Sequence, residues 1–74
     1  MENYHVVADD AGWRLHAQGS DRKLLGAKTK AELLDQLPGY MEGRVGSVKI
    51  HTENGQIEEE RTYPRSEDPS QSKG

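Results

Sequence analysis

Short runs of β-branched and alternating residues at the start of the chain predict two β-strands. Residues 4–8 are rich in β-branched and aromatic side chains, and residues 13–17 alternate apolar with polar side chains. The intervening Asp-Asp-Ala-Gly sequence is typical of a turn, because aspartate bonds to nearby backbone and glycine adopts positive φ. Pairing the strands across this turn places one set of side chains on the face that becomes buried: Tyr4, Val6, Ala8, Trp13, Leu15 and Ala17. The opposite, polar face carries His5, Val7, Arg14 and His16.

The middle of the chain predicts a third short strand over residues 23–27 and then a helix. Thr29 and Glu32 form a capping box, in which each side chain satisfies a backbone amide of the other residue, so a helix should start there. Ala31, Leu34 and Leu37 are spaced to share one helical face, with Leu33 beside them. Pro38 interrupts this pattern, because proline removes a helical hydrogen bond. We expect either a kinked helix that reaches residue 42 or a break followed by one further turn.

The last part of the chain predicts a β-hairpin. An Asn-Gly pair at residues 54–55 separates the strand-like residues 47–52 and 56–63, which is the strongest short-range signal for a hairpin. A two-residue turn would set His51 opposite Glu58, Lys49 opposite Glu60 and Val48 opposite Arg61. The predicted core of the whole domain comprises Tyr4, Val6, Trp13, Leu15, Leu25, Leu34, Leu37, Val48, Ile50 and Ile57.

These elements follow one another in the order β-β-β-α-β-β. The economical arrangement is an α+β domain, with a single antiparallel sheet and the helix packed on one of its faces. We expect the domain to span residues 1–63. Residues 64–74 contain no large apolar side chain and are predicted to form a disordered tail, because they bury too little surface to offset their chain entropy.

Composition limits the chemistry that this chain can support. Of its 74 residues, 31% are hydrophobic and 31% are charged, so the core of so small a domain must be thin. The chain has no cysteine, which excludes disulfides, thiolate metal sites and cysteine nucleophiles and favours a reducing compartment. With no signal peptide or membrane span visible, we expect a cytoplasmic protein. No phosphate-binding glycine loop or catalytic constellation is visible, so we expect neither enzymatic activity nor a cofactor.

The charges are unevenly distributed along the chain. The net charge is −3, which opposes strong nonspecific binding of nucleic acids. Residues 14–30 nevertheless contain five basic residues and a single acidic one, whereas residues 53–60 contain four glutamates. A basic stretch is usually just a solvated surface. If it binds a ligand, the free amides at the start of the helix suit a phosphate, and the candidate binding residues are Arg14, His16, Lys28 and Lys30.

The histidines are the other candidates for a site. His5 and His16 are predicted to be cross-strand neighbours on the polar face of the first hairpin, and His51 would join them if the two hairpins are adjacent. Neighbouring imidazoles can share a divalent metal. Two imidazoles without a third ligand rarely make a specific site, so we predict no metal centre here.

Six short segments, in order, resemble a known family. They are His5-Val6-Val7, Gly12-Trp13, Thr29 to Glu32, Ile50-His51, Asn54 to Ile57 and Glu59 to Tyr63. Together they make the chain similar, over about residues 4–63, to the small bacterial proteins grouped as domain of unknown function 2188. The resemblance implies a compact β-rich domain with one helix and brings no activity, cofactor or catalytic residue. The chain departs from the family at residues 37–40, where the family continues an alanine-rich helix.

The sequence therefore favours a non-enzymatic protein-binding or accessory domain that acts through its surface, as a monomer or weak homodimer. An open sheet leaves two edges that a protein partner can extend. Weak binding of nucleic acid or phosphate through residues 14–30 is the alternative.

Overall fold

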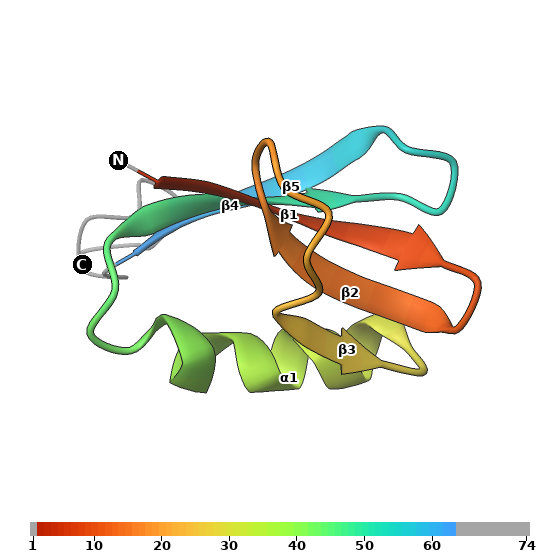
Figure 1. Cartoon of the computed structure of the whole chain (residues 1–74), viewed down its shortest axis with the longest axis horizontal. Coiled ribbons are helices and arrows are strands. Elements are labelled where there is room, and N and C mark those ends of the chain that lie inside the picture. Colours follow the sequence, from red (N-terminus) through yellow and green to blue (C-terminus); the bar gives the residue numbers. More distant parts are fainter. Residues whose placement is uncertain (1, 64–74) are drawn as a thin grey trace, which may run out of the picture.

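A computed structural model of the chain describes residues 2–63 and shows five strands and one helix (Figure 1). The predicted order β-β-β-α-β-β is confirmed. Residues 64–74, predicted to form a disordered tail, lie outside the described residues. The elements are β1 (Glu2–Asp9), β2 (Gly12–Ala17), β3 (Leu25–Ala27), α1 (Lys30–Met41), β4 (Gly46–His51) and β5 (Ile57–Tyr63).

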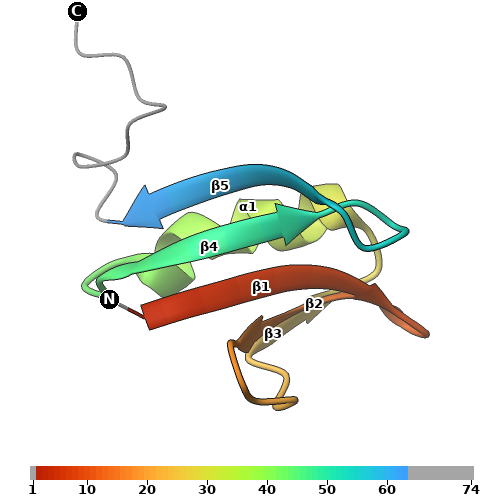
Figure 2. The ribbon, with the colours of Figure 1, turned by 90° about the horizontal axis from the view of Figure 1, so that it is seen from above.

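The sheet is mixed, with the strand order β3-β2-β1-β4-β5 (Figure 2). β1 pairs with β4 in parallel and every other pair is antiparallel, so the prediction of an antiparallel sheet is wrong at this one pair. The reason is the helical crossover. β3 runs parallel to β1, since both are antiparallel to β2. A helix that crosses back over the sheet returns the chain to the end where the preceding strand began, so β4 runs in the direction of β3 and β1.

The first hairpin forms in the predicted register. Val6 lies opposite Leu15, Ala8 opposite Trp13, and His5 opposite His16. Because side chains alternate between the two faces, Val6 and Leu15 become fully buried while the two histidines take the other face. The period-two pattern therefore determined this register, as a one-residue slip would have exposed both apolar residues.

The helix begins at the predicted cap and continues through Pro38 to Met41. Its buried residues are Leu33, Leu37 and Met41, whereas Leu34 is only half-buried, so the predicted helix face was wrong by one position. Trp13 and Leu25 also pack at the margin of the core. The buried core comprises Tyr4, Val6, Leu15, Leu33, Leu37, Met41, Val48, Ile50 and Tyr63.

The second hairpin contains a β-bulge that the sequence did not reveal. Lys49 lies opposite Glu60 and Val48 opposite Arg61, as predicted. Between Ile50 and His51 the register shifts, so that Ile57 rather than Glu58 lies opposite His51. Ile57 is consequently 59% exposed and not part of the core, which corrects a second prediction. The bulge frees the Glu58 carboxylate to form an ion pair with Lys30 at the start of α1.

The helix cap offers a first test of this fold. Thr29 Oγ1 accepts a hydrogen bond from the amide of Glu32 at 3.1 Å. Thr29→Ala removes this acceptor and should lower the free energy of unfolding by about 1 kcal/mol in urea denaturation. Thr29→Ser, which keeps a hydroxyl acceptor at the cap, is the control and should unfold close to the urea concentration of the wild type. Helical content that melts at unchanged urea concentration in Thr29→Ala would contradict the cap.

Candidate binding face

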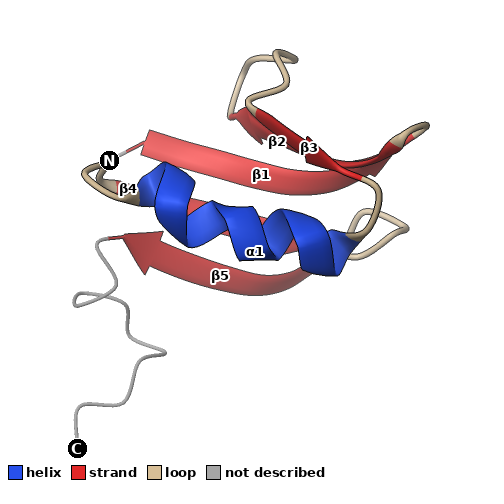
Figure 3. Ribbon diagram, turned by 90° about the horizontal axis from the view of Figure 1, so that it is seen from below, coloured by secondary structure: helices blue, strands red, loops and turns tan. Residues whose placement is uncertain are grey.

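The helix covers only one face of the sheet (Figure 3), and no other described element packs on the opposite face. We call that opposite side the uncovered face. Its side chains are those that alternate with the core residues along each strand. None of the described helices is long and apolar enough to cross a membrane, and no pocket is found among residues 2–63. The uncovered face carries Asn3, His5, Val7, Asp9, Arg14, His16, Ser47, Lys49, His51, Ile57, Glu60 and Thr62.

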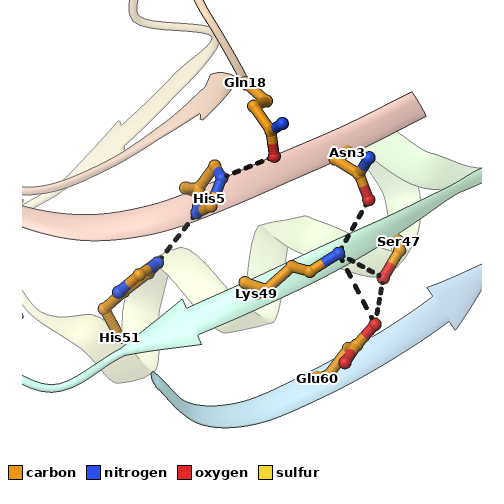
Figure 4. Close-up of polar contacts among 7 residues, drawn as sticks. All are labelled: Asn3, His5, Gln18, Ser47, Lys49, His51 and Glu60. Carbon is orange, nitrogen blue, oxygen red and sulfur yellow. Dashed lines mark hydrogen bonds and ion pairs between the residues drawn. The ribbon is translucent and has the colours of Figure 1, made fainter. Parts of the chain in front are cut away.

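Three imidazoles meet in the middle of this face, on the neighbouring strands β2, β1 and β4. His5 lies between the other two: its ring stacks on His16 with centroids 5.5 Å apart, and its Nδ1 is 2.8 Å from His51 Nε2. His5 Nε2 is 3.3 Å from Gln18 Oε1 (Figure 4). The other two imidazoles are also hydrogen-bonded to the backbone. His16 Nδ1 is 2.9 Å from the carbonyl oxygen of Ala17, and His51 Nδ1 is 3.1 Å from that of Gly55. We call His5 and His51 the imidazole pair.

Burial and neighbouring charge keep His5 neutral. Partial burial is the main cause that lowers the pKa of His5 from its ordinary 6.5, and repulsion by His51, His16 and Lys49 lowers it further. The hydrogen bond with Gln18 opposes this shift in the pKa. The central imidazole is therefore uncharged at neutral pH.

A second polar network lies beside the imidazoles and joins three strands. Lys49 Nζ donates to Asn3 Oδ1 at 2.7 Å on β1 and to Ser47 Oγ at 3.3 Å, and it lies 3.6 Å from Glu60 Oε2 on β5. The Ser47 hydroxyl donates to the same Glu60 oxygen at 2.6 Å. Lys49 is thus held and its charge is balanced, so this part of the face carries little net charge (Figure 4).

The β2–β3 side of the face is basic. Arg14 on β2 lies opposite Gly26 on β3. A Cβ placed on Gly26 would meet Lys23 Cδ at 3.0 Å and Lys23 Nζ at 3.3 Å, so the Lys23 side chain crosses the uncovered face in the space that a larger residue would fill. Within residues 2–63, neither Arg14 nor Lys23 forms an ion pair. We call Arg14 and Lys23 the basic end of the face.

Comparison with known proteins identifies the family. The family described as "Uncharacterized protein conserved in bacteria (DUF2188)" matches residues 4–63. The chain belongs to this family. No curated protein and no solved structure matches the chain. The resemblance expected from the ordered segments is therefore confirmed, and the family description assigns no activity to the DUF2188 domain.

The DUF2188 domain separates the four binding residues proposed from sequence. Arg14 and His16 lie together on the uncovered face. Lys30 lies on the helix side, where its ammonium is 5.1 Å from the centroid of Trp13 and pairs with Glu58, and Lys28 is exposed in the segment between β3 and α1. The basic stretch of the sequence is thus divided between two sides of the domain, because the chain turns from β3 into α1 within it.

Sequence reasoning missed Lys23 and the contact between His5 and His51. The glycine at residue 26, within a strand and opposite a long basic residue, was the available signal for Lys23, since strand glycines mark close approach of another group. The contact between His5 and His51 depends on the parallel pairing of β1 with β4, which no local pattern indicates. Among the described residues of the DUF2188 domain, no group of three or more metal-ligating side chains is found.

Proposed function

We propose that this DUF2188 domain is a non-enzymatic binding domain that recognises single-stranded nucleic acid through its uncovered face. The observation that carries the proposal is the continuity of this face. The basic end leads directly to His16 on the same strand as Arg14, then to the imidazole pair and the amides of Asn3 and Gln18. The proposal also places the domain in the cytoplasm, as the absence of cysteine favours.

The basic end supplies groups that suit a phosphate. Arg14 Nε is buried and has no hydrogen-bond partner among the described residues, so this donor is unsatisfied. A guanidinium binds phosphate through paired N–H donors, and Lys23 adds a charge beside it. One acidic residue, Asp9, lies at the same end of the face. Its Oδ1 accepts a hydrogen bond from the Ala11 amide at 2.9 Å. With a net charge of −3, binding should be weak and steeply dependent on salt.

The rest of the face suits bases rather than more phosphates. The Asn3 and Gln18 amides and the imidazoles can donate and accept hydrogen bonds at base edges. Neighbouring strands are about 4.8 Å apart, so the imidazoles on β2, β1 and β4 extend over about 10 Å of the face. A single strand exposes the edges of its bases, whereas a duplex uses them for pairing, which favours a single strand as the ligand.

A protein partner, which the sequence favoured, stays a second candidate. One observation supports it: the Ile57 side chain lies beside His51 at the edge of a largely polar face and is 59% exposed. Exposed aliphatic anchors are more typical of protein interfaces than of nucleic-acid interfaces.

The proposal is tested by fluorescence anisotropy with labelled oligothymidylate and oligouridylate of about ten nucleotides. Lys23→Gln should weaken binding roughly fivefold, as expected for a loss of about 1 kcal/mol, and should reduce the slope of log affinity against log salt by about 0.7. Lys28→Gln, the same change in the same basic stretch but away from the basic end, should leave the salt slope unaltered.

Three results would count against the proposal. Binding of neither oligonucleotide at low salt overturns it. An equal loss in Lys23→Gln and Lys28→Gln would show that only the overall charge matters. An acidic peptide of matched length that binds more tightly than the oligonucleotides would favour the protein partner instead.

A further inference from the structure

We infer that ligand binding on the uncovered face is coupled to proton uptake by the imidazole pair, His5 and His51. This inference rests on the proposed function and adds its regulation. The pair lies at the junction of β1 and β4, next to His16 and within the same face as the basic end. Proton uptake there would change the charge of the surface that meets the ligand.

The hydrogen bonds of the pair can be counted. His51 Nδ1 lies 3.1 Å from the carbonyl oxygen of Gly55, so that nitrogen must carry a proton to make this bond. In a neutral His51, Nε2 then carries none and accepts from His5 Nδ1, 2.8 Å away. A neutral His5 leaves its Nε2 without a proton, facing the Gln18 amide.

The Gln18 amide allows the pair to exist in two protonation states. With its NH₂ toward His5, Gln18 donates to the unprotonated Nε2 and the pair is neutral. With its oxygen toward His5, as drawn in Figure 4, Nε2 carries a proton and His5 is an imidazolium that donates on both sides. One added proton therefore requires only that this amide turns over. A second added proton would place hydrogens on both His5 Nδ1 and His51 Nε2, and the two rings would be forced apart.

The charged groups around the pair explain why the first proton is withheld at neutral pH. From β2 it faces His16 and, further along, Arg14; from β4 it faces Lys49. Lys23 extends the positive charge from the loop before β3. The opposing carboxylates are Glu60 on β5, which is 3.6 Å from Lys49, and Asp9 at the end of β1. The nearest neighbours are cationic or can become so, consistent with the lowered pKa of His5.

An anionic ligand changes this balance. Phosphates on the face would offset the repulsion from His51, His16 and Lys49 and favour the imidazolium form of His5. Because linkage is reciprocal, protonation must strengthen ligand binding by the same factor. Affinity should therefore rise as pH falls, by at most about tenfold per pH unit for one linked proton.

The experiment measures oligothymidylate affinity at about pH 7.5 and about pH 5.5, a range that spans histidine titration while thymine and phosphodiesters keep their charge. The wild type should bind about tenfold more tightly at the lower pH. His5→Gln, which keeps a hydrogen-bonding side chain, should gain about threefold or less. His16→Gln, the same change on the same face but outside the hydrogen-bonded pair, should keep most of the effect.

Two failures can be told apart. If the wild type binds equally well at both pH values, or if His5→Gln keeps the full gain, the coupling is wrong and the proposed function stands. If the wild type binds at neither pH, the proposed function fails and the coupling falls with it. Far-ultraviolet circular dichroism at both pH values confirms folding, since a pKa lowered from 6.5 means that the folded state loses stability as pH falls below that value.

Discussion

Gly12→Ala should leave the domain largely unfolded at room temperature. Gly12 begins β2 with a φ of +140°, where side chains are rarely found. A Cβ there would lie 2.3 Å from the carbonyl oxygen of Ala27 and 2.8 Å from the Cα of Lys28. These are backbone atoms that cannot turn aside, so either the first hairpin or the β2–β3 pairing must move. The strain and the lost strand pairing together should lower the free energy of unfolding by more than about 3 kcal/mol. The whole free energy of unfolding of a domain of this size is roughly 3–5 kcal/mol.

Two other glycines separate the clash from the general effect of adding a methyl group. Gly19 also has a positive φ, +83°, but a Cβ there would meet nothing within 4 Å. Gly19→Ala should therefore lower the free energy of unfolding by only about 1 kcal/mol. Gly39 lies inside α1 with open space around it, so Gly39→Ala should stabilise the domain by about 0.5–1 kcal/mol. Circular dichroism during urea denaturation gives all three values, and equal losses in Gly12→Ala and Gly19→Ala would contradict the close contact with Ala27.

The sequence predicted those parts of the fold that local patterns control. The Gly12 turn set the register of the first hairpin, because the alternation on both sides left one way to bury Val6 and Leu15. Thr29 set the start of the helix through its cap. The bulge before His51 has no comparable signature. It compensates for a turn that is one residue longer than the expected two-residue turn, because the Thr52 amide donates to the carbonyl oxygen of Gln56.

The candidate binding face was less predictable because it depends on long-range pairing. The neighbourhood of His5 and His16 followed from the first hairpin. Their contact with His51, however, requires β4 to lie beside β1 in parallel, which results from the direction in which α1 crosses the sheet. Lys23 was missed for a related reason, as its position above Gly26 depends on the path of the loop before β3. Pairing across the sheet, rather than spacing along the chain, assembles this face.

Leu33→Ala should strongly destabilise the domain, and it tests directly which face of α1 is buried. Leu33 is fully buried together with Leu37 and Met41, one and two turns further along. Removing its side chain should lower the free energy of unfolding by about 2–5 kcal/mol, because the lost burial is compounded by the cavity that remains. Leu34→Ala is the same change at the next residue, which is only half-buried, and should cost about 1 kcal/mol in the same urea denaturation.

A larger loss in Leu34→Ala than in Leu33→Ala would restore the helix face predicted from the spacing of residues 31, 34 and 37. The location of the buried residues also matters for the binding experiments on the uncovered face. Since α1 and the core residues of the strands supply the buried apolar side chains, the exposed side chain of Lys23 contributes little to stability. Lys23→Gln should therefore unfold at the same urea concentration as the wild type. A loss of oligonucleotide binding in that variant would then report on the face itself rather than on the fold.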